Sequence, residues 1–165
     1  MSSRRLLGRR AALLGAFALS ACGLEPIYGA KGAGKRLFGK VRPRDPDTYQ
    51  DFSFNTRIAE RLGPDEGAVF DLDYRLSIGV VAQAITQEQV TTRYSLNGTA
   101  DFVLKDRNGK ALTSGRVSTF SSYSTTGTTI ATLTAEADAR RRLARMLADQ
   151  VVTRLLAASP DLPET

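Results

Sequence analysis

Alternation of apolar and polar residues with a period of two dominates the middle of this chain and limits its fold more than any other feature. From Asp71 onward, every second side chain is apolar, at Leu72, Tyr74, Leu76, Ile78, Val80, Ala82 and Ala84. A period of two places such side chains on one face of a β-strand. We therefore expect a long strand over 71–84, with one face on a hydrophobic core and the other face polar.

Two further strands are expected after the first. The second runs from about Thr91 to Leu104 and points Tyr94, Leu96, Ala100, Phe102 and Leu104 inward. Asp106-Arg107-Asn108-Gly109 is then a hairpin turn, because Asn-Gly readily adopts positive φ angles. The third strand runs from about Lys110 to Ser124. Its apolar positions do not keep one parity along the strand: Leu112, Val117, Phe120 and Tyr123. That change predicts a β-bulge near Gly115.

Two helices are expected, one before these strands and one after them. Phe54, Ile58 and Leu62 recur every four residues, with Asp51 or Ser53 as the cap and Gly63-Pro64 as the stop. Thr134 is the expected cap of the closing helix, whose apolar stripe consists of Ala139, Leu143, Met146, Leu147, Val151 and Leu155. The arginines of that helix lie mainly off the stripe, at 140, 141, 142, 145 and 154. They suit a solvated face, or alternatively contact with a partner or an anionic lipid.

The expected order of elements is strand, helix, three strands and helix, with a short first strand over Arg36 to Val41. This order predicts an α+β fold, a two-layer sandwich in which two helices pack on one face of a four-stranded, mainly antiparallel sheet. The other face carries Arg93, Asn97, Thr99 and Arg116 and stays polar. Such a face suits water or a polar partner.

The first 21 residues have the layout of a secretory signal peptide. Four arginines lie within the first ten residues, and the apolar run Ala11–Ala21 is shorter than the roughly 20 residues that span a bilayer. The run ends in Leu19-Ser20-Ala21-Cys22, which resembles the bacterial lipobox, whose cysteine is acylated and becomes the first mature residue. We therefore expect acyl chains, palmitate among them, on Cys22. The alternative is an ordinary secretion signal with a chance cysteine.

This reading divides the chain into a signal peptide (1–21), a lipidated tether (22–35), a single α+β domain (36–159) and a polar tail (160–165). Ser3-Arg4-Arg5-Leu6-Leu7 only partly resembles a twin-arginine signal, so we favour the general secretory route. Gly23 stands where an aspartate retains such lipoproteins at the inner membrane. We therefore expect the outer membrane, with the domain on the periplasmic side.

Charge and composition exclude several classes of function. Four of the 23 Lys and Arg residues precede Cys22, and none of the 17 Asp and Glu residues do. The mature chain therefore carries 19 basic and 17 acidic residues, a net charge of +2. That charge gives no support for nucleic-acid binding. The chain has no His, and its one cysteine is the lipid site, so imidazole-based triads and metal sites are excluded.

Two weaker motifs also fail as catalytic sites. Asp71 and Asp73 lack a recognisable catalytic partner and suit the solvated end of a strand. The stretch Gly29–Arg36 departs from a phosphate-binding loop, because Arg36 replaces the hydroxyl residue that holds magnesium. We therefore expect no enzyme and no cofactor.

The start of the mature chain resembles a known family. Cys22-Gly23, followed by Pro26-Ile27-Tyr28-Gly29, is similar to the Cys-Gly-Phe-x-Pro-Leu-Tyr-Gly opening of one form of LptE, the lipopolysaccharide-assembly lipoprotein family. Leu24 and Ile27 are conservative replacements in that motif, and the order of elements agrees over the whole mature chain. The resemblance implies an outer-membrane lipoprotein that plugs the LptD β-barrel and helps deliver lipopolysaccharide to the cell surface.

Lys105, Arg107 and Lys110 cluster around the expected hairpin tip. These cations suit the phosphates of lipopolysaccharide, an anionic glycolipid, although a hairpin tip is also charged simply because it is exposed. A small domain with a polar sheet face suits the lumen of a large barrel, whose inner wall is polar. The alternative function is that of a periplasm-facing lipid-binding carrier in an unrelated pathway.

Overall fold

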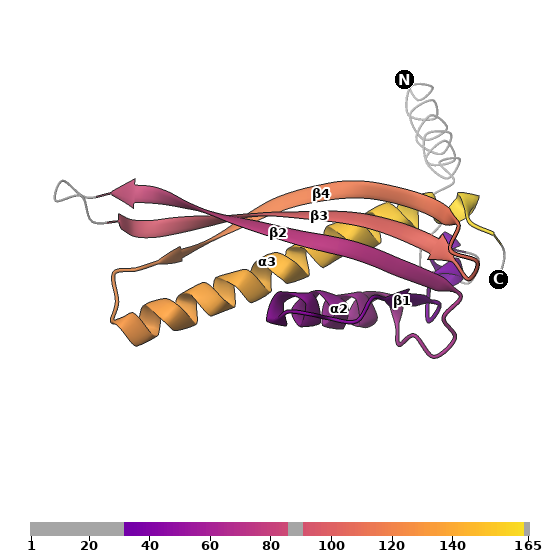
Figure 1. Cartoon of the computed structure of the whole chain (residues 1–165), viewed down its shortest axis with the longest axis horizontal. Coiled ribbons are helices and arrows are strands. Elements are labelled where there is room, and N and C mark those ends of the chain that lie inside the picture. The colour runs from indigo at the N-terminus through magenta and orange to yellow at the C-terminus, as the bar shows by residue number, and fades with distance from the viewer. Residues whose placement is uncertain (1–31, 86–90, 164–165) are drawn as a thin grey trace, which may run out of the picture.

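A computed structural model of the chain describes residues 32–85 and 91–163. These residues form an elongated two-layer sandwich, with a sheet above and helices below (Figure 1). The strands are β1 (Val41–Pro43), β2 (Phe70–Ile85), β3 (Thr91–Asp106) and β4 (Ala111–Ser124). The helices are α2 (Tyr49–Leu62) and α3 (Thr129–Ala158), and the short 3-10 turns η1 (Ala33–Arg36) and η2 (Ser159–Asp161) lie near the two ends of the described chain.

The sheet has the order β1-β2-β3-β4. β1 pairs with β2 in parallel, and the β2–β3 and β3–β4 pairs are antiparallel. Both helices lie on the same face of the sheet (Figure 1), where α3 packs mainly under β3 and β4 and α2 lies beside it. The predicted α+β sandwich, with two helices on one face of a mainly antiparallel sheet, is confirmed.

The core lies between the inward face of the sheet and the two helices. Its buried side chains include Phe54 and Ile58 of α2, Leu72 of β2, and Leu143 and Leu147 of α3. α3 approaches β3 very closely, because a Cβ atom on Gly98 would lie 3.0 Å from the Leu143 side chain. A side chain at position 98 would therefore require the Leu143 side chain to shift.

Both helices begin earlier than the apolar periodicity indicated. In α2 the Thr48 hydroxyl accepts a hydrogen bond from the Asp51 amide (3.1 Å), while the Asp51 carboxylate accepts one from the Thr48 amide (3.0 Å). Thr48 is therefore the cap of α2, and the prediction of Asp51 or Ser53 was wrong, although Asp51 completes the capping box. Likewise Thr128, not Thr134, caps α3.

The first strand also lies later than expected. The predicted strand over Arg36 to Val41 was wrong, since Ala33–Arg36 forms η1 and the strand covers Val41–Pro43. Gly39 separates the two elements with a φ of 70°. This left-handed conformation interrupts an extended strand at that point.

The bulge in β4 lies at Leu112 rather than near Gly115. Pairing of β3 with β4 is continuous from Arg93↔Ser124 to Leu104↔Thr113 and then shifts to Lys105↔Ala111. Leu112 is the extra residue, and it still packs against the core. Because the register beyond it is unbroken, Phe120 points outward and is 70% exposed, while Ser121 takes the buried position.

The described body extends somewhat beyond 36–159, because Gly34 is buried and Leu162 joins the core. The division into signal peptide, tether, domain and tail stays a prediction, and Cys22 lies outside the described residues. Within residues 32–85 and 91–163, none of the helices has the length and apolar character needed to cross a bilayer.

Candidate functional site

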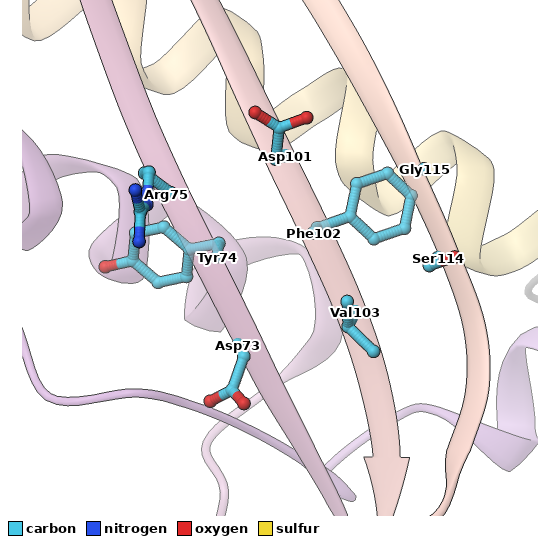
Figure 2. Close-up of a pocket in the computed structure, with 8 residues that line it drawn as sticks. All are labelled: Asp73, Tyr74, Arg75, Asp101, Phe102, Val103, Ser114 and Gly115. Atoms are coloured by element: carbon cyan, nitrogen blue, oxygen red, sulfur yellow. The ribbon is translucent and has the colours of Figure 1, made fainter.

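The outward face of the sheet, which points away from both helices, is polar. Asp73 and Arg75 of β2, Asp101 and Val103 of β3, and Ser114 of β4 line a shallow pocket on it (Figure 2). Their positions follow from the strand register and from the alternation of side chains along each strand. The sequence pattern predicted the alternation on β2 and β3 but not the register. The pocket is an open surface across three strands that carries charged, hydroxyl and apolar groups.

A row of alternating charges crosses this face. Arg75, Asp101 and Arg116 are cross-strand neighbours on β2, β3 and β4. The Arg116 Nη2 atom lies 3.1 Å from Asp101 Oδ2. Hydrogen bonding from Arg116, with the charge of Arg75 adding to it, lowers the pKa of the Asp101 carboxyl below its ordinary value. The carboxylate is therefore held ionised, which suits ion pairing rather than proton transfer.

Short hydroxyl side chains occupy much of the remaining outward face. Ser114, Ser118 and Ser122 alternate along β4 with inward-pointing residues, and all three are exposed. Phe120 stands among them as an isolated exposed ring. Among the described residues there is no group of three or more His, Cys, Asp or Glu side chains able to hold a metal ion. This chemistry favours a binding surface for a polar partner.

The three predicted lipopolysaccharide-binding residues lie at the same end of the sheet, around the β3–β4 turn. Lys105 forms an ion pair with Asp73, and Arg107 Nη2 donates to the Ala68 carbonyl at 3.1 Å. Lys110 is exposed, and no ion pair of its side chain is found within the described ranges. The three cations therefore lie around the turn, as expected, but Lys105 and Arg107 already interact with other groups of the protein.

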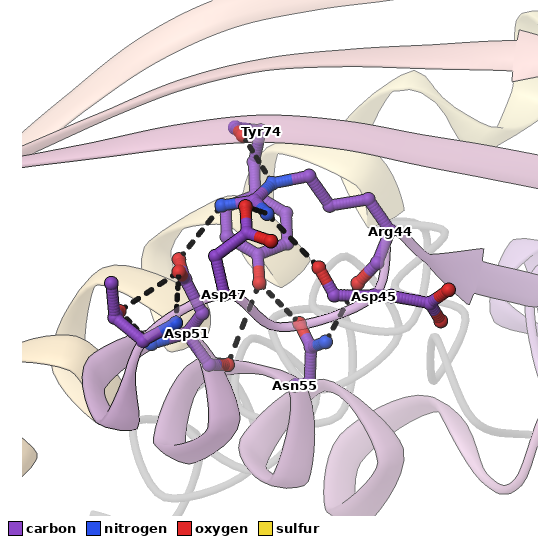
Figure 3. Close-up of polar contacts among 7 residues, drawn as sticks. Arg44, Asp45, Asp47, Asp51, Asn55 and Tyr74 are labelled. Atoms are coloured by element: carbon purple, nitrogen blue, oxygen red, sulfur yellow. Dashed lines mark hydrogen bonds and ion pairs between the residues drawn. The ribbon is translucent and has the colours of Figure 1, made fainter.

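A second polar cluster, which the sequence reasoning missed, centres on Arg44 (Figure 3). The Arg44 guanidinium donates to the Tyr74 carbonyl (2.9 Å), to Asp51 (2.9 Å) and to Asp47 (2.7 Å). It also lies 4.5 Å from the centre of the Tyr74 ring. Arg44 thereby joins β2, the connector and the start of α2. No periodicity in the sequence marks this cluster, because only the fold brings Arg44 and Tyr74 together.

Tyr74 of β2 completes this cluster (Figure 3). Its hydroxyl donates to Asn55 Oδ1 at 2.7 Å, and its ring lies 4.3 Å from that of Phe54. Burial raises the pKa of the Tyr74 hydroxyl above its ordinary value. The Arg44 cluster is therefore a partly buried support that holds α2 against β2.

Arg36 fixes where the chain enters the domain. Its Nη1 donates to the carbonyls of Pro160 and Leu162, each at 2.8 Å. This clamp holds η1 against η2, at the same end of the molecule as the β3–β4 turn (Figure 1). Any tether that precedes residue 32 therefore starts from that end.

Comparison with solved structures finds the same fold in bacterial lipoproteins. A lipoprotein from Caulobacter crescentus CB15 is 19% identical, with a TM-score of 0.66 over 80% of this chain and 98% of that one. Rare lipoprotein B from Shewanella oneidensis is 12% identical, with a TM-score of 0.57 over 74% and 96%. A minor lipoprotein from Acinetobacter baumannii is 20% identical, with a TM-score of 0.55 over 78% and 96%.

Comparison of sequences gives the family. A search of curated proteins finds no match to the chain. The family model of LptE, described as lipopolysaccharide-assembly, matches residues 39–155, which span the region from just before β1 to the last turn of α3. Because this match covers most of the chain and agrees with the resemblance of the Cys22 region, the chain belongs to the LptE family of lipopolysaccharide-assembly proteins.

Proposed function

We propose that this protein is an outer-membrane lipoprotein that plugs the LptD β-barrel and works with it to deliver lipopolysaccharide to the cell surface. The observation that carries the proposal is the family match over residues 39–155. Membership of a lipopolysaccharide-assembly family supports a role in that process. The polar outward face is a surface suited to the proposed barrel partner.

The outward face matches the chemistry of a barrel lumen. Large outer-membrane barrels have polar inner walls, so a plug needs a polar surface of its own. The Arg75–Asp101–Arg116 row and the serines of β4 offer charged and hydroxyl groups over three strands. An interface of this kind rests on many modest contacts. We therefore assign the outward face to the barrel wall.

The barrel assignment is tested by purifying the tagged full-length protein from gently solubilised outer membranes. We expect one large β-barrel protein in one-to-one stoichiometry. Arg116→Glu combined with Ser118→Arg should reduce the recovered barrel several-fold, whereas the matched change Arg154→Glu on the exposed side of α3 should not. Recovery of the unmodified protein as a free monomer would reject the plug.

The anchor is tested separately. Cys22→Ser should abolish incorporation of labelled palmitate, because serine cannot form the thioether. Barrel binding should survive in whatever soluble form is exported, since the domain makes the contacts. Continued labelling of the variant would disprove the lipobox assignment.

The β3–β4 turn is our proposed contact for lipopolysaccharide phosphates. Because Lys105 and Arg107 already have internal partners, Lys110 is the cation most available to a phosphate. Changing Lys105, Arg107 and Lys110 together to glutamate should weaken binding of purified lipopolysaccharide while barrel recovery is retained, and Lys110→Glu alone should give the largest single effect. The same triple change to glutamine controls for loss of the internal contacts. Unchanged lipopolysaccharide binding in the glutamate variant would remove this site.

A further inference from the structure

One side of β2 is left without a neighbouring strand over most of its length. β1 has only 3 residues and pairs with the first three of the 16 residues of β2. After β1, the Arg44 amide donates to the Leu72 carbonyl (3.0 Å) and the Arg44 Nε donates to the Tyr74 carbonyl (2.9 Å). Beyond Tyr74, the described part of the chain places no strand on this side of β2 (Figure 1).

Backbone groups are therefore open on this edge. The carbonyls of Leu72 and Tyr74 point away from β3, and successive residues of a strand direct their backbone groups to opposite sides. The register with β3 stays regular up to Ala82 and shifts after it. The residues beyond Tyr74 whose N–H and C=O groups point to the open side are Leu76, Ile78, Val80 and Ala82. We call the run Leu76–Ala82 the open edge.

The open edge lacks the usual protection of an edge strand. Its sequence, Leu-Ser-Ile-Gly-Val-Val-Ala, contains no charge and no proline. Val80 and Val81 lie on opposite faces of β2, and each is 46% exposed. By contrast β4, at the other side of the sheet, carries the Leu112 bulge and the charge of Arg116, two features that discourage pairing with another strand. The open edge is therefore suited to pairing with a further strand.

Gly79, at the middle of the open edge, indicates where a second backbone would come closest. A Cβ atom at this position would meet only the Asn97 carbonyl oxygen, at an ordinary contact distance of 4.0 Å. The packing of the domain itself therefore does not require a glycine here. A glycine inside a strand often marks a place where another backbone approaches.

A second copy of the same edge matches it in chemistry. Because Gly79 is the midpoint of the open edge, an antiparallel copy with its two-fold axis at Gly79 uses the whole run on both chains. The residues directly opposite one another would be Ile78 and Val80, Leu76 and Ala82, and Ser77 and Val81. None of these pairs brings charges together. Four hydrogen-bonded pairs, each exchanging two bonds, give about eight backbone hydrogen bonds.

The surroundings of the open edge leave room for this copy. Leu76 and Ile78, together with Arg75 and the start of α2, line a cavity of about 360 Å³. Val80 and Ala82 of the second copy would lie beside these two apolar side chains. Because the paired strands run in opposite directions, α2 of the second copy lies toward the far end of β2, which α2 of the first copy does not reach (Figure 1).

We propose that free copies of this protein form a two-fold dimer in which the open edges pair, so that two four-stranded sheets become one continuous sheet. The pairing covers an edge that other strands could otherwise join. It belongs to the free protein, because the proposed plug has one copy in each barrel, and so it goes beyond that function.

Disulfide trapping tests the dimer with the full acylated chain. In membranes from cells that make the protein in excess, Gly79→Cys places two thiols at the two-fold axis, where facing Cα atoms lie about 4.5 Å apart. We expect mild oxidation to convert most of this variant into a covalent dimer. The unmodified chain measures any contribution of Cys22, its one cysteine.

The matched control is Ser77→Cys, which introduces an exposed thiol on the same strand and face. Position 77 faces Val81 of the second copy and not itself, so this variant should give at least tenfold less covalent dimer than Gly79→Cys. Equal amounts from the two variants, no dimer from Gly79→Cys, or only mixed disulfides with another protein would each overturn the proposal.

Changes at Val80 separate edge pairing from folding. Val80→Pro removes an amide that points to the open side but takes no hydrogen bond from β3, and it should lower the covalent dimer of Gly79→Cys at least tenfold. Val80→Ala keeps the amide and should retain most of the dimer. Val80→Lys serves as the second variant should the proline lower the melting temperature, because it keeps the amide and places a charge beside Ile78 of the second copy. An undiminished dimer in folded Val80→Pro or Val80→Lys protein would refute the paired edge.

Discussion

The two halves of this molecule share the same three long strands, but the helices cover the inward face of the sheet to different extents in each half. Near the β3–β4 turn both helices cover the inward face, and side chains such as Leu104, Leu147 and Leu155 are fully buried. Near the far ends of β2 and β3 only the first turns of α3 remain, and Val80, Ile130 and Leu133 face solvent. The strands therefore extend well beyond the core that stabilises them.

Polar interactions follow the same division. The covered half holds the Arg44 cluster, and ion pairs of Arg57 and Arg61 with Asp149 join α2 to α3. In the uncovered half, the ion pairs of α3 are mostly local, as between Arg142 and Asp138 or Arg140 and Glu136. Stability is therefore concentrated in the covered half, which also holds the start of the described chain.

The largest expected effect compares the same substitution in the two halves of α3. Leu147→Ala should destabilise the domain by about 2–5 kcal/mol, because the side chain is fully buried and leaves a cavity. Leu133→Ala should change stability by less than about 0.5 kcal/mol, since that side chain is mostly exposed. Denaturant unfolding of the purified soluble domain gives both values. Similar losses in the two variants would show that the far half is part of the core.

The second prediction concerns the Arg44 cluster. Arg44→Ala should cost about 1–3 kcal/mol, because it removes the cation from Asp51, whose carboxylate is almost completely buried. Arg142→Ala is the matched control, because the side chains of Arg142 and of its ion-pair partner Asp138 are 51% and 52% exposed and its hydrogen bond to the Ser121 hydroxyl is long (3.3 Å). It should cost under about 1 kcal/mol. Thermal unfolding of the two variants measures the difference. A larger loss for Arg142 would reverse the proposed order of the two halves.

The sequence predicted the strands well because burial on one face imposes a strict period of two. The alternation over 71–84 and 91–104 follows the observed β2 and β3 to within a few residues. The same logic failed for Phe120, an apolar residue on the outward face, and so misplaced the bulge that belongs to Leu112. A pattern read by polarity alone cannot identify an apolar residue that faces outward.

The helix ends were missed for a related reason. The first turns of α3, from Thr129 to about Thr134, have no core to face, so no apolar stripe marked them as helical. Caps at Thr48 and Thr128 are local hydrogen-bond features that precede the stripe. The Arg44 cluster joins residues distant in sequence, Arg44 and Tyr74, which only the fold brings together. Such tertiary contacts are outside what periodicity can predict.

The third prediction uses the raised pKa of Tyr74 in the covered half. An unfolded tyrosine ionises near pH 10, whereas folded Tyr74 keeps its proton to higher pH. Its contribution to stability is therefore complete below about pH 10 and is lost as the pH rises above it, by at most about 1.4 kcal/mol per pH unit. Unfolding at pH 9 and pH 11 should show a smaller loss for Tyr74→Phe than for the unmodified protein.

The control for this pH effect is Tyr49→Phe, at an exposed site on the same helix layer. That variant should lose stability between pH 9 and pH 11 as much as the unmodified protein does. Equal losses for Tyr74→Phe and the unmodified protein would show that burial of Tyr74 does not control the alkaline response.

The smallest expected effect tests whether the greater stability of the covered half comes from the helix layer alone or also from the outward face of the sheet. Arg116 and Asp101 form an ion pair on the outward face over the covered half, with side chains 70% and 42% exposed. Arg116→Ala should therefore lower the stability only slightly, and 1 M salt should remove most of that difference by screening the charges. The pKa of the Asp101 carboxyl, followed by NMR, should rise toward its ordinary value, because the hydrogen bond that lowers it is lost. Ser118→Ala, on the same strand and face, should leave both quantities unchanged, whereas a loss for Arg116→Ala as large as that for Leu147→Ala would mean that the outward face also stabilises the covered half.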